Sequence, residues 1–160
     1  MGLSAKKPSI SKSPAARRED RFAWAREQAG LLRSHQLQKI DAEDIAQEID
    51  DVGSAEYYRM ESALRIILLH LLKWDHQPAK RSRSWAISIR THRRHFDRQL
   101  TKNPGLKPEL AEALAAAYAD AVDEAALETG LDESAFPEIC GYGWDDIRNR
   151  QIVWPASKTN

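Results

Sequence analysis

The stretch Ile66–Trp85, "IILLHLLKWDHQPAKRSRSW", is the part of the chain from which the fold is predicted. It begins as an apolar run and changes character at Trp74, after which Pro78 prevents easy continuation of a helix. An arginine-rich segment then follows. The stretch therefore predicts a core helix that reaches the surface just before a second, basic helix. His70 lies inside the apolar run and is the residue that this interpretation explains least.

Three helical segments are predicted up to Trp74. Within residues 19–35, apolar side chains recur at helical spacing: Phe22, Ala25, Ala29 and Leu32. Asp41 is expected to cap a second helix with Ile45, Ile49 and Val52 as its stripe, and Gly53 to end it. Ser54 is then expected to cap the core helix, whose stripe is Met60, Leu64, Ile67, Leu68 and Leu71.

Helical patterns also fill most of the chain after Pro78. A basic helix is expected from about Ser84 to Leu100, with one apolar face: Trp85, Ile89, Phe96 and Leu100. Pro108 suits the first turn of an alanine-rich helix that ends at Gly130. Its narrow stripe comprises Leu110, Ala113, Leu114, Ala117 and Ala121. A short helix is expected from about Asp145 to Arg150, with four side chains across the bundle: Phe136, Trp144, Ile147 and Trp154.

These patterns predict an all-α protein, a single helical bundle of about five helices. The pattern of alternating apolar and polar residues that is typical of strands does not occur. Residues 1–18 are rich in Lys, Ser and Pro and are predicted to form a disordered, basic, flexible N-terminal tail. The bundle domain is expected to span residues 19–155, followed by a tail of residues 156–160.

Charge and cysteine content narrow the classes of function. The 24 Lys and Arg residues balance 24 Asp and Glu residues, so attraction of the whole molecule to nucleic acid is not expected. The longest apolar run is far shorter than a membrane span, and the N-terminus lacks the apolar region of a secretory signal. No membrane association is therefore expected. Cys140 is the single cysteine, which fits a reducing cytoplasm.

A candidate polar cluster comprises Glu48, Glu61, Arg65, His70 and Trp74. If the helices flanking Gly53 form an antiparallel hairpin, Glu48 and Glu61 are offset by about 4 to 5 Å, and Glu48 and His70 by roughly 18 Å. Arg65, one turn after Glu61, is expected to compensate the two carboxylates. We interpret the cluster as fixing the hairpin. The alternative is a metal-dependent enzyme that uses Glu48, Glu61 or His70.

His70 itself has two interpretations. It is either a partly buried imidazole packed near Trp74, which we favour, or a metal ligand or general base. The Glu-x-x-His pattern of di-iron bundles is absent from the sequence. Cys140 has acidic neighbours that would raise its pKa, and no His follows it. We therefore assign no catalytic residue, no metal ligand and no cofactor.

The basic segment admits an interpretation as a nucleic-acid-binding surface. Its candidate residues are Lys80, Arg81, Arg83, Trp85, Arg90, Arg93 and Arg94. Arginines could contact phosphates while Trp85 stacks on a base. The favoured interpretation is that the basic helix packs beside the acidic segment from Glu109 to Asp146, which has no Lys or Arg.

Three segments together resemble the bacterial family catalogued as domain of unknown function number 29. They are "FAWAREQAGLLRSHQ", "IAQEIDDVGSAEYYRMESALRIILLHLLKWDHQPAKRSRSW" and "FPEICGYGWDDI", the last followed by "WP". The resemblance extends over roughly Asp20 to Pro155. It implies the fold of that family and a bacterial origin, and it transfers no catalytic residue because the family has no established activity.

The function predicted from these observations is a small, non-catalytic protein-interaction module. Complete helical patterning combined with the lack of a catalytic constellation favours it. Its apolar and aromatic residues are expected to serve a homodimer or an unidentified protein partner: Trp24, Tyr57, Tyr58 and Trp154. Nucleic-acid binding through residues 80–98 is the first alternative, and the metal-dependent enzyme is the second.

Overall fold

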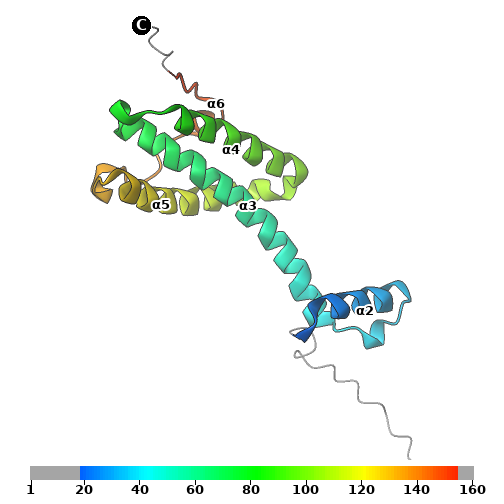
Figure 1. Ribbon diagram of the computed structural model, residues 1–160. Helices are drawn as coiled ribbons and strands as arrows, with labels where there is room; N and C mark the ends of the chain where they lie inside the picture. The colour runs from blue at the N-terminus through cyan, green and yellow to red at the C-terminus, as the bar shows by residue number, and fades with distance from the viewer. Residues whose placement is uncertain (1–18, 155–160) are drawn as a thin grey trace, which may run out of the picture. The chain divides into compact units, whose positions relative to one another are not determined.

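The computed structural model describes residues 19–154, and all regular structure within this range is helical (Figure 1). The prediction of an all-α protein with about five helices is therefore confirmed. The described residues divide into two compact units, one ending at Gly53 and the other beginning at Ser54. The predicted tails, residues 1–18 and 156–160, lie outside the described residues. The predicted extent of one bundle domain, residues 19–155, stays a prediction.

The first unit contains helix α2 (Arg21–Arg33), the short 3-10 helix η1 (Leu37–Lys39) and the start of helix α3. The Asp20 side chain caps α2 by accepting a hydrogen bond of 2.9 Å from the backbone nitrogen of Ala23. Trp24 and Gln28 are buried, whereas Phe22 is 74% exposed. The predicted apolar face of this helix was therefore wrong. The carboxylate of Asp41 selects the other face, because it accepts hydrogen bonds from both Trp24 and Gln28.

Helix α3 runs without interruption from Ala42 to His76. Gly53 therefore lies inside a helix, and the predictions that it ends one helix and that Ser54 caps the next were wrong. A glycine within a helix costs only about 1 kcal/mol relative to alanine, which its helix-forming neighbours can offset. Ile49 and Val52 are each 66% exposed, so the stripe predicted for the hairpin is not buried against other described residues.

The second unit is built around the C-terminal part of α3. Figure 1 shows this part of α3 between helix α4 (Arg83–Lys102) and helix α5 (Leu110–Thr129). The predicted core stripe of α3 is fully buried: Met60, Leu64, Ile67, Leu68 and Leu71. Ile89 and Phe96 of α4 join the same core, as do three small residues of α5: Ala113, Ala117 and Ala121. These predictions of core residues are confirmed.

The connections between helices follow local chain chemistry. The 3-10 helix η2 (Pro78–Lys80) follows α3, and Ser82 caps α4 through a hydrogen bond from the backbone nitrogen of Trp85. Another 3-10 helix, η3 (Pro104–Glu109), leads into α5. Gly130 ends α5 in the left-handed conformation with a φ of 72°, as the sequence predicted.

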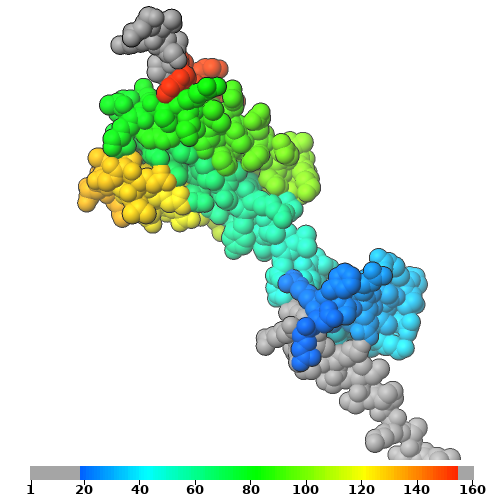
Figure 2. Space-filling model, viewed as in Figure 1, coloured from blue at the N-terminus to red at the C-terminus, as the bar shows by residue number. Residues whose placement is uncertain are grey.

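The chain after α5 returns across the second unit. It contains the 3-10 helix η4 (Glu133–Ala135) and helix α6 (Trp144–Asn149), close to the predicted position of the last helix. Phe136 and Ile147 are buried, while Trp144 and Trp154 are 36% and 38% exposed. In Figure 2 the last described residues, coloured red, lie against the green surface of α4. This segment brings polar groups from three elements together.

Candidate functional site

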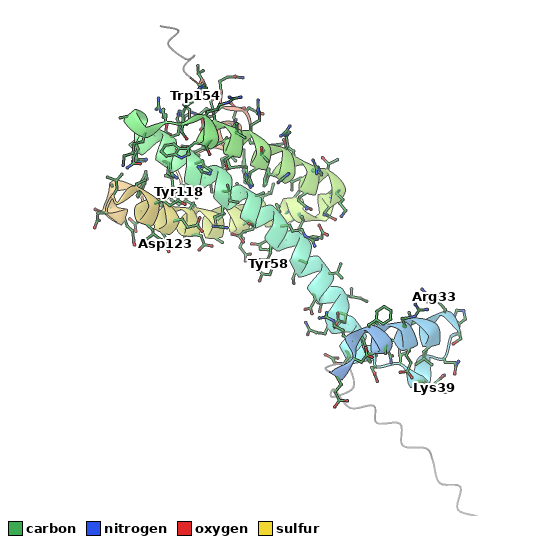
Figure 3. The ribbon with its side chains drawn as sticks, in the orientation of Figure 1. Arg33, Lys39, Tyr58, Tyr118, Asp123 and Trp154 are labelled. Atoms are coloured by element: carbon green, nitrogen blue, oxygen red, sulfur yellow. The ribbon has the colours of Figure 1, made fainter. Side chains whose placement is uncertain are left out.

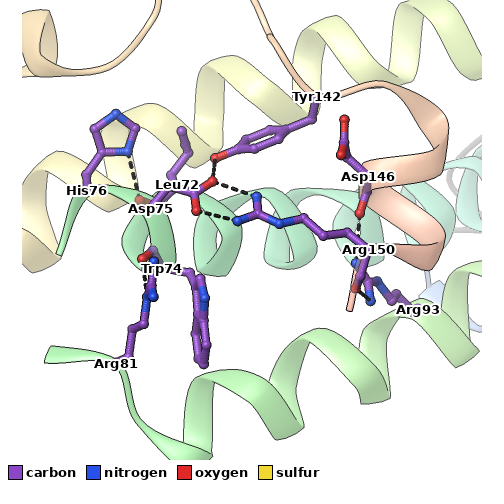
Figure 4. A network of polar contacts seen from close by, with 9 residues as sticks. All are labelled: Leu72, Trp74, Asp75, His76, Arg81, Arg93, Tyr142, Asp146 and Arg150. Carbon is purple, nitrogen blue, oxygen red and sulfur yellow. Dashed lines mark hydrogen bonds and ion pairs between the residues drawn. The ribbon is translucent and has the colours of Figure 1, made fainter. Parts of the chain in front are cut away.

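A polar network joins the chain after α5, residues 131–154, to the end of α3 (Figure 4). We call these residues the C-terminal segment. The Asp75 carboxylate accepts two hydrogen bonds from the Arg150 guanidinium, at 2.6 and 2.8 Å. It also accepts one from the Tyr142 hydroxyl at 2.9 Å. We call these three residues the C-terminal latch. Paired guanidinium–carboxylate hydrogen bonds fix both position and orientation, so the latch holds the segment in register against α3.

Electrostatics keep the latch in one protonation state. Burial would raise the pKa of Asp75, but the hydrogen bonds from Arg150 and Tyr142 lower it overall. Burial and the neighbouring Asp75 carboxylate raise the pKa of Tyr142 far above its usual range. At neutral pH the latch therefore contains an ionised carboxylate, a guanidinium and a neutral phenol. None of the three is prepared for proton transfer, which favours a structural role.

The Arg93 side chain, from α4, caps the C-terminal end of α6. Its Nε donates to the carbonyl of Ile147 at 2.6 Å, and its two Nη atoms donate to the carbonyls of Asp146 and Arg150, each at 2.8 Å. The last carbonyls of a helix have no partner within the helix, so a cation is favourable there. The Arg93 guanidinium donates to neutral carbonyls, so no carboxylate bonded to it compensates its positive charge.

A groove of about 410 Å³ lies between α4 and the C-terminal segment. We call it the arginine groove, because its lining includes Arg83, Arg90, Arg93 and Arg150. The remaining lining residues are Ala86, Ile87, Ile89, Asn149, Gln151, Ile152 and Trp154. No carboxylate side chain of the described residues is among them. The groove therefore combines an excess of positive charge with an aromatic wall.

The predicted nucleic-acid-binding residues fall into different environments. Arg83, Arg90 and Arg93 line the arginine groove, whereas Lys80 and Arg94 are exposed outside it. The Arg81 Nε donates to the carbonyl of Trp74 at 2.8 Å. The Lys73 ammonium lies 4.6 Å from the centre of the Trp85 ring. Trp85 therefore already has a cation over its ring.

Sequence reasoning missed Arg150 and Trp154 as parts of this groove. They lie 48 and 52 positions after the end of α4 in the chain, beyond the reach of any helical spacing. A signal for the other wall did exist. Arg83, Ala86, Ile87, Arg90 and Arg93 follow the repeat of three and four residues that places side chains on one face of a helix. That face carries two apolar side chains, Ala86 and Ile87, among the arginines. Apolar side chains at these positions indicate a helix face that is partly covered rather than fully solvated.

The acidic helix α5 makes its observed ion pairs with α3. Glu124 pairs with Arg65, and Glu128 pairs with Lys73, which is 7% exposed. The ion pairs observed for α4 lie elsewhere, between Asp97 and Arg148 and between Lys102 and Glu56. The favoured expectation, that the charges of the basic helix would be balanced by α5, therefore finds no support in these ion pairs.

The members of the predicted polar cluster do not meet in the predicted way. Glu48 pairs with Arg21 of α2, and Arg65 pairs with Glu124. Because α3 is continuous, the hairpin that would place Glu48 opposite Glu61 does not exist. The Glu61 Oε1 is buried without a hydrogen-bond partner among the described residues. Burial, reinforced by Asp120, raises the pKa of Glu61.

His70 is half-buried on α3, and its Nδ1 has no hydrogen-bond partner among the described residues. Burial, together with the nearby positive charge of Lys73, lowers the pKa of His70 to about 4. The ring is therefore neutral at neutral pH. Among residues 19–154, no group of three or more His, Cys, Asp and Glu side chains is arranged to hold a metal ion. Trp74 is 4% exposed, as a core residue.

A second, more apolar groove of about 610 Å³ lies between α5 and residues 133–140. We call it the α5 groove. Its apolar lining comprises Ala111, Leu114, Ala115, Ala119, Val122, Phe136, Pro137, Ile139 and Cys140. Asp123, Glu133 and Glu138 add negative charge, and no Lys or Arg of the described residues lines it. Figure 3 shows Tyr118 and Asp123 on α5, the helix that forms one wall.

The aromatic residues expected to serve a partner are in mixed positions. Trp24 is 7% exposed and belongs to the interior of the first unit. Tyr57 is half-buried and packs on the core, whereas Tyr58 is 63% exposed. Within the described residues, no helix has both the length and the apolar character needed to cross a membrane.

Comparison with known proteins identifies a family and no characterised relative. A family model described as "Domain of unknown function DUF29" matches residues 18–153. No curated protein and no solved structure matches the chain. The match includes parts of both compact units and every helix described above.

Proposed function

Since the chain belongs to the family described as domain of unknown function DUF29, whose description names no activity, we propose a function from the geometry. The protein is a non-catalytic interaction module, and its α5 groove binds a basic amphipathic helix of a partner protein. The observation that carries this proposal is the composition of the groove, which is apolar inside and lined with carboxylates but no cation among the described residues. We propose a reducing, bacterial cytoplasmic setting, which the single cysteine, Cys140, supports.

The dimensions of the groove support a helical occupant. Its lining residues on α5 extend from Ala111 to Asp123, which corresponds to about 18 Å of helix at 1.5 Å per residue. A partner helix of three to four turns is of similar length. The alanines of α5 present small side chains, so that another helix can approach the α5 backbone closely. Helix-in-groove recognition of this kind is read as apolar anchors at a spacing of three and four residues.

The charge of the groove lining predicts the charge of the partner. Asp123 lies on α5, while Glu133 and Glu138 belong to the facing segment, so carboxylates contribute from both walls. Lys or Arg residues flanking the apolar stripe of the bound helix would meet these carboxylates. An acidic helix with the same apolar stripe would instead be repelled. The charge of the lining therefore discriminates between two otherwise similar partners.

Binding of designed peptides tests this proposal. A labelled helical peptide with a leucine stripe and flanking lysines is expected to bind the full-length protein in a fluorescence-anisotropy titration, and the same peptide with glutamates to bind at least tenfold more weakly. Ala115→Arg, which places bulk and positive charge in the groove, is expected to weaken lysine-peptide binding at least tenfold. Ala116→Arg is the matched control, because Ala116 is exposed on α5 but does not line the groove.

Three results would contradict the proposal. The first is that the two peptides bind equally, and the second is that Ala115→Arg and Ala116→Arg have equal effects. The third is a homodimer, detected by solution mass measurement, that Ala115→Arg dissociates, because a second copy of the chain would then be the occupant. Circular dichroism of both variants confirms that each remains folded.

The metal-dependent alternative has its own test. Elemental analysis of protein purified without a chelator measures bound metal, and Glu61→Gln would remove a carboxylate whose Oε1 has no hydrogen-bond partner among the described residues. The interaction module predicts a sample without stoichiometric metal in which Glu61→Gln changes stability alone. A stoichiometric metal that Glu61→Gln removes would overturn the proposed function in favour of the enzyme.

A further inference from the structure

The arginine groove is a second site, distinct from the α5 groove, and its chemistry is opposite in charge. Helix α4 contributes Arg83, Arg90 and Arg93 to one wall, and the C-terminal segment contributes Arg150 and Trp154 to the other. The latch and the contacts of Arg93 hold the two walls together. The groove is therefore built on fixed elements rather than on a single helix surface.

The four arginines do different things. Arg150 is bonded to Asp75, so its charge is largely compensated. Arg93 is bonded to three neutral carbonyls and keeps its charge. The side chains of Arg83 and Arg90 are exposed and form no hydrogen bond or ion pair with another described residue. Two guanidinium groups are therefore available to a ligand, and Arg93 adds a third positive charge to the lining of the groove.

A phosphate group is the ligand chemistry that this arrangement fits. Guanidinium groups bind phosphate oxygens through paired, charge-assisted hydrogen bonds. Arg83 and Arg90 are separated by seven residues, or about 10 Å along the helix axis, and their long side chains can converge on a phosphate or contact successive ones. The absence of carboxylates among the described lining residues leaves this positive charge unopposed within the groove.

The aromatic wall adds a second requirement. Trp154 lines the groove and is 38% exposed, so part of its indole surface is accessible. Exposed aromatic rings beside arginines are the arrangement on which nucleic-acid bases stack. Asn149 and Gln151 also line the groove and carry side-chain amides, of which the Asn149 nitrogen already donates one hydrogen bond to Asp145. A ligand that carries both a flat heteroaromatic ring and a phosphate would use the two parts at once.

We propose that the arginine groove binds a nucleotide unit, with its phosphate on Arg83 and Arg90 and its base against Trp154. The unit is either a free nucleotide or one residue of a single-stranded nucleic acid, since both present the same phosphate and base. The interface differs from a binding site on α4 alone, because the C-terminal segment supplies the stacking wall. It does not depend on the α5 groove and has no residue in common with it.

The test measures binding by the full-length protein at low salt with two probes. A fluorescently labelled single-stranded oligonucleotide reports by anisotropy, and a mononucleotide reports by competition against it. The double variant Arg83→Ala with Arg90→Ala is expected to weaken oligonucleotide binding at least tenfold. If both side chains contact phosphates, it also reduces the slope of log affinity against log salt by about 1.4. Trp154→Ala is expected to weaken binding about tenfold with little change in that slope.

A matched control separates a site from general attraction to positive charge. The double variant Arg94→Ala with Arg98→Ala removes the same charge from exposed positions of α4 that do not line the groove. It is expected to change affinity less than threefold. The side chains of both pairs of arginines form no hydrogen bond or ion pair with another described residue, so both variants should keep the fold, as circular dichroism would verify.

The outcomes divide cleanly. If the mononucleotide competes and the groove variants weaken its binding, a free nucleotide is a sufficient ligand. If only the oligonucleotide binds and the groove variants weaken its binding, the ligand is single-stranded nucleic acid. Either result supports the proposal. Undetectable binding of both probes at low salt would overturn it, as would equal losses in the groove and control variants. Binding of anionic lipid vesicles without binding of either probe would also overturn it.

Discussion

His70 combines burial with an unsatisfied ring nitrogen, and this combination gives the residue a measurable effect on stability. Its pKa in the folded protein is about 4, below the value of about 6.5 for an unfolded chain. As the pH falls from about 6.5 to 4, the unfolded state therefore takes up the proton first, and the folded state loses stability. Below pH 4 both states are protonated and this loss no longer grows.

We predict that protonation of His70 lowers the free energy of unfolding of the wild-type protein by on the order of 1 to 2 kcal/mol between pH 7 and pH 4. This value allows for solvent around a partly exposed ring. Urea unfolding followed by circular dichroism across this range measures the loss. His70→Leu should remove that component, whereas the same substitution at the exposed His95 should retain it. Equal pH profiles for wild type and His70→Leu would show that His70 is not the responsible group.

At the scale of single elements, two glycines show how position decides the effect of one residue type. Gly53 lies within α3, where an added Cβ would meet no atom within 4 Å. Gly130 also has space around it, but its φ of 72° lies in the left-handed region that side chains disfavour. The same substitution should therefore have opposite effects at the two positions.

Gly53→Ala is expected to stabilise the protein by roughly 0.5 to 1 kcal/mol, because alanine favours the helix. Gly130→Ala is expected to destabilise it by about 1 kcal/mol or more, because alanine is strained at the end of α5. Thermal unfolding of the two variants beside wild type measures both effects. A destabilised Gly53→Ala would indicate that a break in α3 at this position is needed in the folded protein.

At the scale of the whole molecule, the C-terminal latch joins the last segment of the second unit to α3. Asp75 and Arg150 are separated by 75 positions, and their side chains are 26% and 32% exposed. The pair Asp97 and Arg148 joins the same segment to α4, but its side chains are 46% and 45% exposed. Partly buried pairs with paired hydrogen bonds contribute more than exposed ones.

A double-mutant cycle with Asp75→Asn and Arg150→Met is expected to give a coupling free energy of about 1 to 2 kcal/mol. The matched cycle with Asp97→Asn and Arg148→Met should give less than about 1 kcal/mol. Urea unfolding of the four proteins in each cycle provides the values. A coupling in the latch no larger than in the exposed pair would mean that other contacts, such as those of Arg93, hold the segment.

The sequence indicates one wall of the arginine groove but not the other. Arg83, Arg90 and Arg93 were candidates from composition and spacing, because all three lie on one helix. Arg150 was not a candidate, and Trp154 was expected to serve a protein partner rather than this groove, because nothing local in the chain indicates which distant helix their segment will cover. The polar cluster failed for a related reason: it depended on a hairpin at Gly53, and a glycine weakens a helix without necessarily ending it.

The amino-acid sequence by itself determined the all-α class, the core stripe of α3, the small-residue stripe of α5 and the end of α5 at Gly130. These features follow from periodicity and backbone preference, which act over a few residues. Tertiary structure alone decided the partners of the charged residues, the burial of Trp24 rather than Phe22, and the two grooves. Those features depend on which distant surfaces meet, and a long side chain can reach several partners from the same position in the sequence.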